Sequence, residues 1–212
     1  MHPAAPPPAG APQLGRRERN KLKVKERLYI SALELFSERG YDQTSIDEIA
    51  ERADVARGTF FNHFQRKEDL ISAWGEQRRQ RLVAMLEDST PHPEGAAMRL
   101  RRCMSILGQI NEDEHRQAAA MLLAWVKAGR PLNEEPYVGA LFASIVEEGR
   151  RNGELRADIG PQQVGNVLRD VYLGTLYRWF REAHAEPNGH LERELQDALE
   201  LLLRGILAAP PE

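Results

Sequence analysis

Residues 44–70 read TSIDEIAERADVARGTFFNHFQRKEDL, and they contain two short apolar repeats with a brief break between them. The apolar positions at helical spacing are Ile46, Ile49, Ala50 and Ala53 in the first repeat and Val55, Phe60 and Phe64 in the second. Helices this short do not persist alone in water, where about 12–15 residues are needed for even marginal helicity. The pattern therefore predicts a helix-turn-helix that packs on a neighbouring helix.

Residues that favour helix ends mark the boundaries of this unit. Thr44 and Ser45 precede the first short helix, with Asp47 and Glu48 three residues after them, which is a doubled capping-box pattern. Gly40 ends the helix that comes before. The apolar face of that earlier helix carries Leu22, Tyr29, Leu33 and Phe36. Together the three helices are expected to form a small N-terminal unit.

The rest of the chain also shows helical periodicity, and no segment shows a convincing strand alternation. A fourth helix begins near Arg66 and is closed by Pro91 and Pro93. Its stripe contains Leu70, Ile71, Trp74, Arg78, Leu82 and Met85. Five more helices are expected over residues 94–110, 112–128, 134–152, 161–183 and 190–207, separated by Gly, Pro and Asn. The sequence thus predicts an all-α protein with an N-terminal three-helix unit joined by a long helix to a larger helical body.

Composition divides the chain into three predicted parts. Residues 1–15 form a Pro/Ala-rich tail that is expected to be disordered. Residues 16–65 form the helix-turn-helix domain, and residues 66–212 form the body. Residues 16–27 hold seven basic and two acidic side chains, a charge of +5 in a chain whose net charge is −3. A basic end on an acidic body indicates a polyanionic partner at that end, and a solvated tail is the alternative.

Cysteine usage and hydropathy point to a cytoplasmic protein. Cys103 is the single cysteine, so no disulfide within the chain is possible, which fits a reducing compartment. A buried core cysteine is a better interpretation of Cys103 than a redox sensor. No run is long enough to span a membrane, and residues 1–15 lack the pattern of a secretory signal. We therefore expect no membrane partner.

The outward face of the second short helix suits the major groove of double-stranded DNA. That face carries Arg57, Gly58, Thr59, Phe61, Asn62 and His63. Arginine, amide, hydroxyl and imidazole groups match the edges and phosphates that the groove presents, and a glycine allows close approach of the backbone. Thr44, Ser45 and Lys67 lie at helix starts, where contact with phosphates is expected.

At these residues the chain resembles a known family. RLYISALELFSERGYDQTSIDEIAERADVARGTFFNHFQRKEDLI, residues 27–71, is similar to the DNA-binding domain of the TetR family of transcriptional regulators. Residues 147–180, EEGRRNGELRADIGPQQVGNVLRDVYLGTLYRWF, are similar to the last part of many members. The resemblance implies a homodimer on a palindromic operator and a small-molecule pocket in the body. It therefore implies a repressor that its ligand releases from DNA.

Four positions depart from the family pattern. Asp54 occupies the turn where glycine is usual, but aspartate tolerates the left-handed conformation better than most residues. Ala56 replaces a capping serine or threonine, which loses about 0.5–2 kcal/mol. Phe61 replaces a tyrosine, and Arg66 replaces a serine at the start of the fourth helix. Arg66 is either a phosphate contact or a solvated surface residue.

Two further sets of functional residues are predicted within the body. An apolar ligand pocket is expected to be lined from among Trp74, Met85, Met104, Leu107, Met121, Trp125, Tyr137, Phe142, Tyr172 and Tyr177, fewer than half of which should touch a ligand. Its polar groups are expected among Arg102, Gln109 and Arg178. The dimer interface is expected on the last two helices, at Leu168, Val171, Thr175, Leu195, Leu199, Leu202 and Ile206.

Other function classes fit the sequence less well. No nucleophile-elbow, zinc-protease or phosphate-loop motif is present, and the six histidines are too scattered to indicate a metal site. We therefore predict a protein that is not an enzyme and needs no cofactor. An all-α enzyme would leave the helix-turn-helix unexplained. An architectural DNA-binding protein that needs no ligand would not require so large a body.

Overall fold

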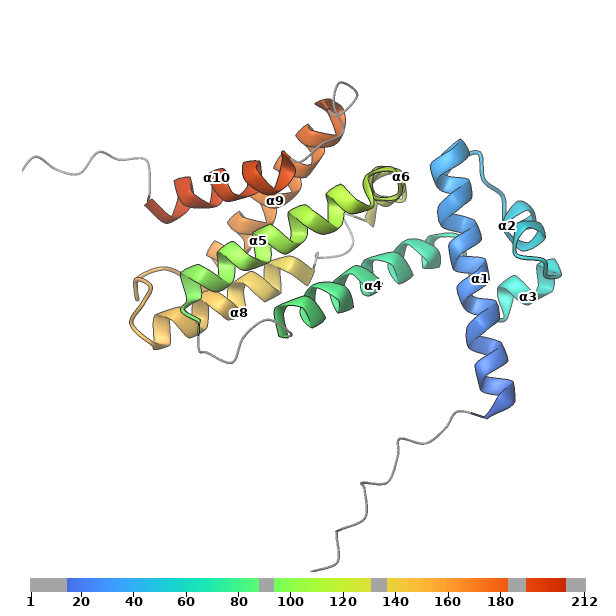
Figure 1. The fold of residues 1–212 in the computed structure, drawn as a ribbon, viewed down its shortest axis with the longest axis horizontal. Helices are drawn as coiled ribbons and strands as arrows, with labels where there is room; N and C mark the ends of the chain where they lie inside the picture. Colours follow the sequence, from blue (N-terminus) through green and yellow to red (C-terminus); the bar gives the residue numbers. More distant parts are fainter. Residues whose placement is uncertain (1–14, 88–93, 131–136, 183–189, 205–212) are drawn as a thin grey trace, which may run out of the picture.

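The computed structural model describes residues 15–87, 94–130, 137–182 and 190–204, and every regular element within these ranges is a helix (Figure 1). The helices are α1 (Arg16–Arg39), α2 (Ile46–Arg52), α3 (Arg57–Phe61), α4 (Glu68–Glu87), α5 (Ala96–Asp113), α6 (His115–Lys127), α8 (Tyr137–Arg151), α9 (Pro161–Glu182) and α10 (Leu191–Arg204). Their bounds lie within a few residues of the predicted ones, and the all-α prediction is confirmed.

Local chemistry explains the tight connection from α1 to α3. Gly40 ends α1 with φ +84°, a conformation that side chains disfavour. Ser45 starts α2 in a reciprocal capping box: its hydroxyl accepts a hydrogen bond from the Glu48 N–H at 3.2 Å, and the Glu48 carboxylate accepts one from the Ser45 N–H at 2.8 Å. Asp54 holds the turn at φ +53°, as the sequence predicts. Ala56, at the N-cap of α3, supplies no side-chain cap.

The first three helices, here called the head, share a core with the start of α4. This core contains Leu28, Leu35 and Phe36 of α1, Ile49 of α2 and Phe60 of α3, all at most 2% exposed. Leu22, predicted on the same face of α1, is 51% exposed instead. It lies in the first turns of α1, which project beyond α2 and α3 (Figure 1). These turns extend away from the core that would have covered Leu22.

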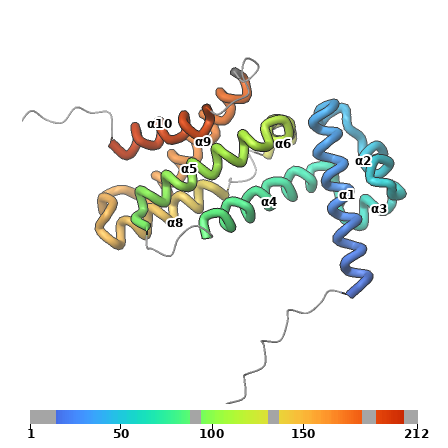
Figure 2. The backbone as a smooth tube through the Cα atoms, in the orientation of Figure 1, coloured from blue at the N-terminus to red at the C-terminus, as the bar shows by residue number. Residues whose placement is uncertain are grey.

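The remaining helices form the body, in which α8 packs along α9 and α5 packs along α10 (Figure 2). The pairing of α8 with α9 is close because Gly165 lacks a side chain. A β-carbon at that position would lie 2.5 Å from the carbonyl oxygen of Gly139 and would clash with it. The body core includes Met104 and Leu107 of α5 and Phe142 of α8, each at most 3% exposed.

Helices α4 and α6 join the head to the body. Leu70 and Ile71 at the start of α4 belong to the head core, whereas Leu82 further along belongs to the body core. Helix α6 contributes Met121 and Ala124 to the head core, and it packs against α1. The head core therefore extends past residue 65 and includes residues of α4 and α6. No helix within the described ranges is long and apolar enough to cross a membrane.

Candidate DNA interface and ligand pocket

Helix α3 presents a polar outer face, as the sequence predicts. Phe60 is buried and anchors the helix, while Arg57, Gly58, Phe61 and Asn62 are exposed. Thr59 and His63 are half-buried on the same short segment. A β-carbon on Gly58 would meet nothing within 4 Å, so this part of the surface is open to close approach.

Arg57 lies at the start of α3 and is held by α2. Its guanidinium donates to Asp47 Oδ2 at 2.9 Å, and both side chains are more than 60% exposed. The same guanidinium carbon lies 6.0 Å from the centre of the Phe61 ring. Exposed ion pairs contribute about 0–1 kcal/mol, so this pair orients Arg57 without fixing it. The Arg57 side chain therefore remains free to exchange its carboxylate partner for a base edge.

The two residues predicted to meet phosphate at the start of α2 have different surroundings. Ser45 is exposed. Thr44 is 2% exposed, and its hydroxyl donates to the carbonyl oxygen of Gly40 at 2.9 Å. The Thr44 hydroxyl therefore stabilises the loop that leads into α2, and contact between phosphate and the N–H groups of this helix start stays a prediction.

Lys67, which the sequence predicts to contact phosphate, has partners within the protein. Its ammonium donates to the carbonyl oxygens of Tyr41 at 2.7 Å and Thr44 at 2.9 Å. It also lies 4.0 Å from the centre of the Tyr41 ring. Burial lowers the pKa of this lysine, and the carboxylates of Glu68 and Asp42 oppose the shift. Lys67 thus fastens the loop between α1 and α2 to the start of α4.

His63 faces the basic part of α1. Partial burial lowers its pKa first, and the positive charges of Lys21 and Lys25 lower it further. The ammonium of Lys25 lies 5.8 Å from the ring centre of Phe64, at the end of the α3 segment. The seven cationic side chains of residues 16–27 are all exposed. The basic turns of α1 therefore lie beside the end of the α3 segment.

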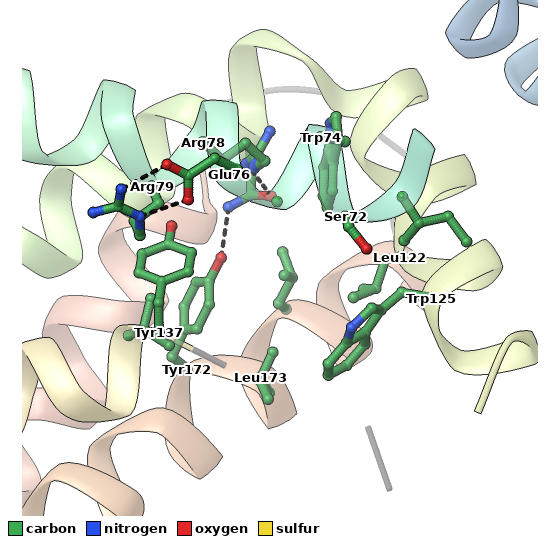
Figure 3. Close-up of a pocket in the computed structure, with 15 residues that line it drawn as sticks. Ser72, Trp74, Glu76, Arg78, Arg79, Leu122, Trp125, Tyr137, Tyr172 and Leu173 are labelled. Atoms are coloured by element: carbon green, nitrogen blue, oxygen red, sulfur yellow. Dashed lines mark hydrogen bonds and ion pairs between the residues drawn. The ribbon is translucent and has the colours of Figure 1, made fainter. Parts of the chain in front are cut away.

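A pocket of about 280 Å³ lies in the body, where α4, α5, α6, α8 and α9 meet (Figure 3). It is lined by Ile71, Ser72, Trp74, Gly75, Glu76, Arg78, Arg79, Asn111, Leu122, Trp125, Tyr137, Val138, Tyr172, Leu173 and Leu176. The lining is mostly aliphatic and aromatic, with a few polar groups, as in small-molecule sites. Its volume lies slightly below the ~300–1,000 Å³ that such sites span.

The predicted pocket residues separate into lining, core and surface. Trp74, Trp125, Tyr137 and Tyr172 line the pocket. Met104, Leu107, Met121 and Phe142 are at most 3% exposed and are absent from its lining, so they belong to the core and their assignment is corrected. Tyr177 is 40% exposed on the surface of α9.

Sequence reasoning missed the polar side of the pocket. Arg78 of α4 donates to Asn111 Oδ1 at 2.7 Å and pairs with Glu114 at 2.8 Å. Asn111 Nδ2 in turn donates to the Tyr172 hydroxyl at 3.1 Å. Figure 3 shows Tyr137 and Tyr172 on one side of the pocket and Trp125 on the other. A signal was present, because Arg78 interrupts the apolar stripe between Trp74 and Leu82.

The residues assigned to a dimer interface are mostly internal. Leu168, Thr175, Leu195 and Leu199 are at most 4% exposed within one chain. A partner could not reach them, which corrects their assignment. Val171 is half-buried and Leu202 is 41% exposed, so both stay candidates. Ile206 lies outside the described residues.

Cys103 is fully buried in the body core. Burial raises the pKa of its thiol to about 12, although Arg99 and Arg102 oppose the shift. A thiol in that environment stays protonated and unreactive near neutral pH. This favours the core interpretation of Cys103 over redox sensing.

Comparison with known proteins agrees with this architecture. Residues 30–74 match the family model described as bacterial regulatory proteins of the tetR family. Residues 130–205 match the model of the C-terminal domain of TetR/AcrR family transcriptional repressors.

Individual relatives match along most of the chain. The HTH-type transcriptional repressor KstR of Mycolicibacterium smegmatis is 30% identical over 198 residues, covering 88% of each chain. The repressor DhaR of Mycobacterium sp. (strain GP1) is 25% identical over 86% of this chain and 94% of its own. Thermus thermophilus FadR, a TetR-family repressor solved in complex with lauroyl-CoA, superposes with a TM-score of 0.63 at 29% identity over 88% of this chain and 97% of its own. The chain therefore belongs to the TetR family of bacterial regulatory proteins, and it is a DNA-binding transcriptional regulator.

Proposed function

We propose that this protein is a homodimeric repressor that binds a palindromic operator through α3 and leaves it when a small, largely apolar molecule enters the body pocket. It acts by binding and release, without catalysing a reaction. The observation that carries this proposal is the position of the pocket against α4. Trp74 and Arg78 of α4 line it, and Ile71 of α4 belongs to both the pocket lining and the head core. A ligand in contact with these side chains acts directly on the helix that continues into the head.

The DNA side of the proposal rests on two surfaces with different roles. Arg57 at the start of α3 is the candidate for reading base edges, since the first residues of a recognition helix usually meet them. The exposed bases of residues 16–27 are candidates for phosphate contacts, which add affinity without sequence preference. We further propose that residues 16–65 carry DNA recognition and that residues 66–212 carry ligand binding and dimerisation.

The proposed dimer face lies on the outer sides of α9 and α10. Val167, Val171, Gly174 and Arg178 follow one another at helical spacing along α9, and Val167 is 43% exposed. A β-carbon on Gly174 would meet nothing within 4 Å, which leaves room for a partner helix. The face continues on α10 through the exposed Leu201 and Leu202. Val167→Arg should therefore produce monomers at micromolar concentration in analytical ultracentrifugation, and Gln162→Arg at an exposed site on the same helix is the control.

The ligand side is supported by the aromatic and aliphatic lining of the pocket and by the likeness to the lauroyl-CoA-bound repressor. In a two-state regulator, the ligand needs only a higher affinity for the state whose α3 helices do not fit successive major grooves. We propose that its apolar part lies between Trp74, Trp125 and Leu173.

The proposal is tested with a fluorescent duplex selected from a random pool by the protein itself. Fluorescence anisotropy follows its release on addition of lauroyl-CoA, fatty acids, alcohols and unrelated polar metabolites. We expect the apolar compounds to release the duplex and the polar ones to leave it bound. As the matched pair, Leu173→Trp should fill the pocket and abolish release, whereas Gln162→Trp, outside both the pocket and the proposed dimer face, should not. If release is the same in both variants, the ligand acts at another site.

A further inference from the structure

Arg78 is an unusual residue for the interior of a helical body. Its side chain is 9% exposed, and it sits on α4 between the head and the bulk of the body. It pairs with Glu114 at 2.8 Å, donates to Asn111 at 2.7 Å, and lies 4.6 Å from the ring centre of Trp74. Burying a guanidinium costs free energy unless the group is paired. The three contacts therefore show which groups stabilise the charge of Arg78 in the free protein.

Arg78 also lies between two cavities. The first is the body pocket of about 280 Å³. The second, of about 330 Å³, is bordered by α1, α4 and the junction of α5 with α6, and its lining is Tyr29, Leu33, Trp74, Gln77, Arg78, Arg81, Glu114 and Gln117. The two linings share Trp74 and Arg78. Arg78 therefore lies between the body pocket and a second cavity that is lined in part by α1 of the head.

Glu114, the partner of Arg78 on the side of the second cavity, has a second cationic partner. The Glu114 carboxylate is also bound by Arg81, whose guanidinium pairs with Asp113 at 3.4 Å as well. If Arg78 turned away, Glu114 would keep a cationic partner. The usual penalty for breaking a buried ion pair, an uncompensated carboxylate, is thus reduced at this position.

On the pocket side, the charges favour an anion. The charged residues of the lining are Glu76, Arg78 and Arg79. Glu76 accepts two hydrogen bonds from Arg79, at 2.7 and 2.6 Å, so these two side chains neutralise each other (Figure 3). The guanidinium of Arg78 is the remaining charge of this lining, and its carboxylate partner in the free protein, Glu114, lies outside the lining. The Tyr172 hydroxyl, which accepts a hydrogen bond from Asn111, has a proton to donate beside it.

We infer that the ligand of this pocket is an apolar molecule with a carboxylate head group, and that the carboxylate takes Arg78 away from Glu114. This inference rests on the proposed function and adds the ligand class and the switch. Glu114 is the N-cap residue of α6, and Met121 and Ala124 of α6 belong to the head core. Loss of the bond between Arg78 and Glu114 leaves Glu114 paired with Arg81 of α4, so the connection between α4 and the start of α6 is weakened. The ligand thereby loosens the connection that holds the head in its DNA-binding position.

The test compares decanoate with decanol, which share an alkyl chain and differ in the anionic head. Binding to the full-length protein is measured by isothermal titration calorimetry. Arg78→Gln should lower decanoate affinity roughly ten- to a hundred-fold, the range for hydrogen bonds to a charged group, and should leave decanol affinity unchanged. Arg99→Gln is the control and should leave the affinity for decanoate unchanged, because Arg99 pairs with Glu148 and lines neither cavity.

A second variant separates ligand recognition from a purely structural role of Arg78. Glu114→Gln removes the competing carboxylate, so that Arg78 keeps its bond to Asn111 but has no carboxylate partner in the free protein. Decanoate should then bind several-fold more tightly than it binds the wild type. It should also raise the melting temperature of this variant more than that of the wild type, because it restores a partner to the buried charge.

The inference is overturned if decanoate does not bind, if it binds Arg78→Gln as tightly as the wild type, or if Glu114→Gln weakens it. These results are distinct from failure of the proposed function. If lauroyl-CoA still releases the operator from Arg78→Gln, the protein is a ligand-responsive repressor that reads a different head group. If no compound releases the operator from the wild type while decanoate binds through Arg78, ligand control of DNA binding is wrong and the site assignment stands.

Discussion

Replacing Lys67 with methionine tests how the head is held together. Methionine keeps most of the aliphatic stem but removes the ammonium that binds the carbonyl oxygens of Tyr41 and Thr44. A hydrogen bond from a charged donor contributes about 1.5–3 kcal/mol, and the partial exposure of this site reduces that value. For the two bonds together we expect a loss of about 2–3 kcal/mol in the free energy of unfolding.

For a chain of this length, such a loss lowers the melting temperature by roughly 4–12 °C. Differential scanning calorimetry measures it directly. The control is Arg66→Met at the neighbouring position, where the side chain is 70% exposed and its nearest carboxylate oxygen is 3.9 Å away. Substitution there should change stability by at most about 0.5 kcal/mol.

DNA binding by the same variant separates the two roles of Lys67. If its ammonium is occupied by carbonyl oxygens, the salt dependence of DNA binding changes little. A lysine that contacts phosphate alone would give the opposite pair of results: the slope of log K against log salt would become shallower by about 0.9, and the melting temperature would not move. That pair of results would refute the assignment of Lys67 to the head structure.

The remaining predictions concern the ends of α3. Ala56→Ser should supply the missing N-cap and raise the free energy of unfolding by about 1 kcal/mol in urea denaturation; no increase would mean that the hydroxyl cannot reach the helix N–H groups. His63 has a pKa below the ordinary 6.5 in the free protein, and a nearby phosphate would favour its charged form. DNA binding should then take up a proton, so affinity rises as pH falls toward and below about 6.5. His63→Gln should flatten this dependence, and an unchanged pH profile would place His63 away from the phosphates.

Much of the fold could be predicted because local signals agreed with one another. In α2, the apolar spacing of Ile49, the capping pair of Ser45 and Glu48, and the turn at Asp54 all indicate the same short helix, and all are observed. Agreement between spacing, caps and turn chemistry is what specifies a helix. The boundaries of the longer helices followed from Gly and Pro for the same reason.

The site was harder to predict because spacing reveals that a side chain is buried but not what covers it. Leu195 and Leu199 form a strong stripe on α10, and they pack inside their own chain instead of against a partner. Thr44 and Lys67 stand where DNA contacts were expected, yet their polar atoms are bound to carbonyl oxygens of the loop between α1 and α2. The bond from Thr44 to Gly40 spans four residues, but the carbonyl partners of Lys67 lie 23 and 26 residues before it, and no local pattern links residues so far apart.

Arg78 is a different case, because its place within an apolar stripe is visible in the sequence but its partners are not. A charged residue in the middle of an apolar stripe must find a partner inside the protein. Its partners, Asn111 and Glu114, come from the end of α5 and the residue after it. Only the three-dimensional arrangement brings them to α4, beside a pocket that Trp125 and Tyr172 complete.

The central claim is that the outer face of α3 reads a DNA sequence, and selection from a pool of random duplexes tests it most directly. The wild type should enrich one two-fold symmetric sequence, with half-sites about one helical turn (~34–36 Å) or a multiple of it apart. Arg57→Ala should relax the preference at one base pair of each half-site and weaken binding there by about 1–3 kcal/mol per contact. Enrichment of no particular sequence by the wild type, or of the same sequence with the same affinity by Arg57→Ala, would contradict this account of how the protein recognises DNA.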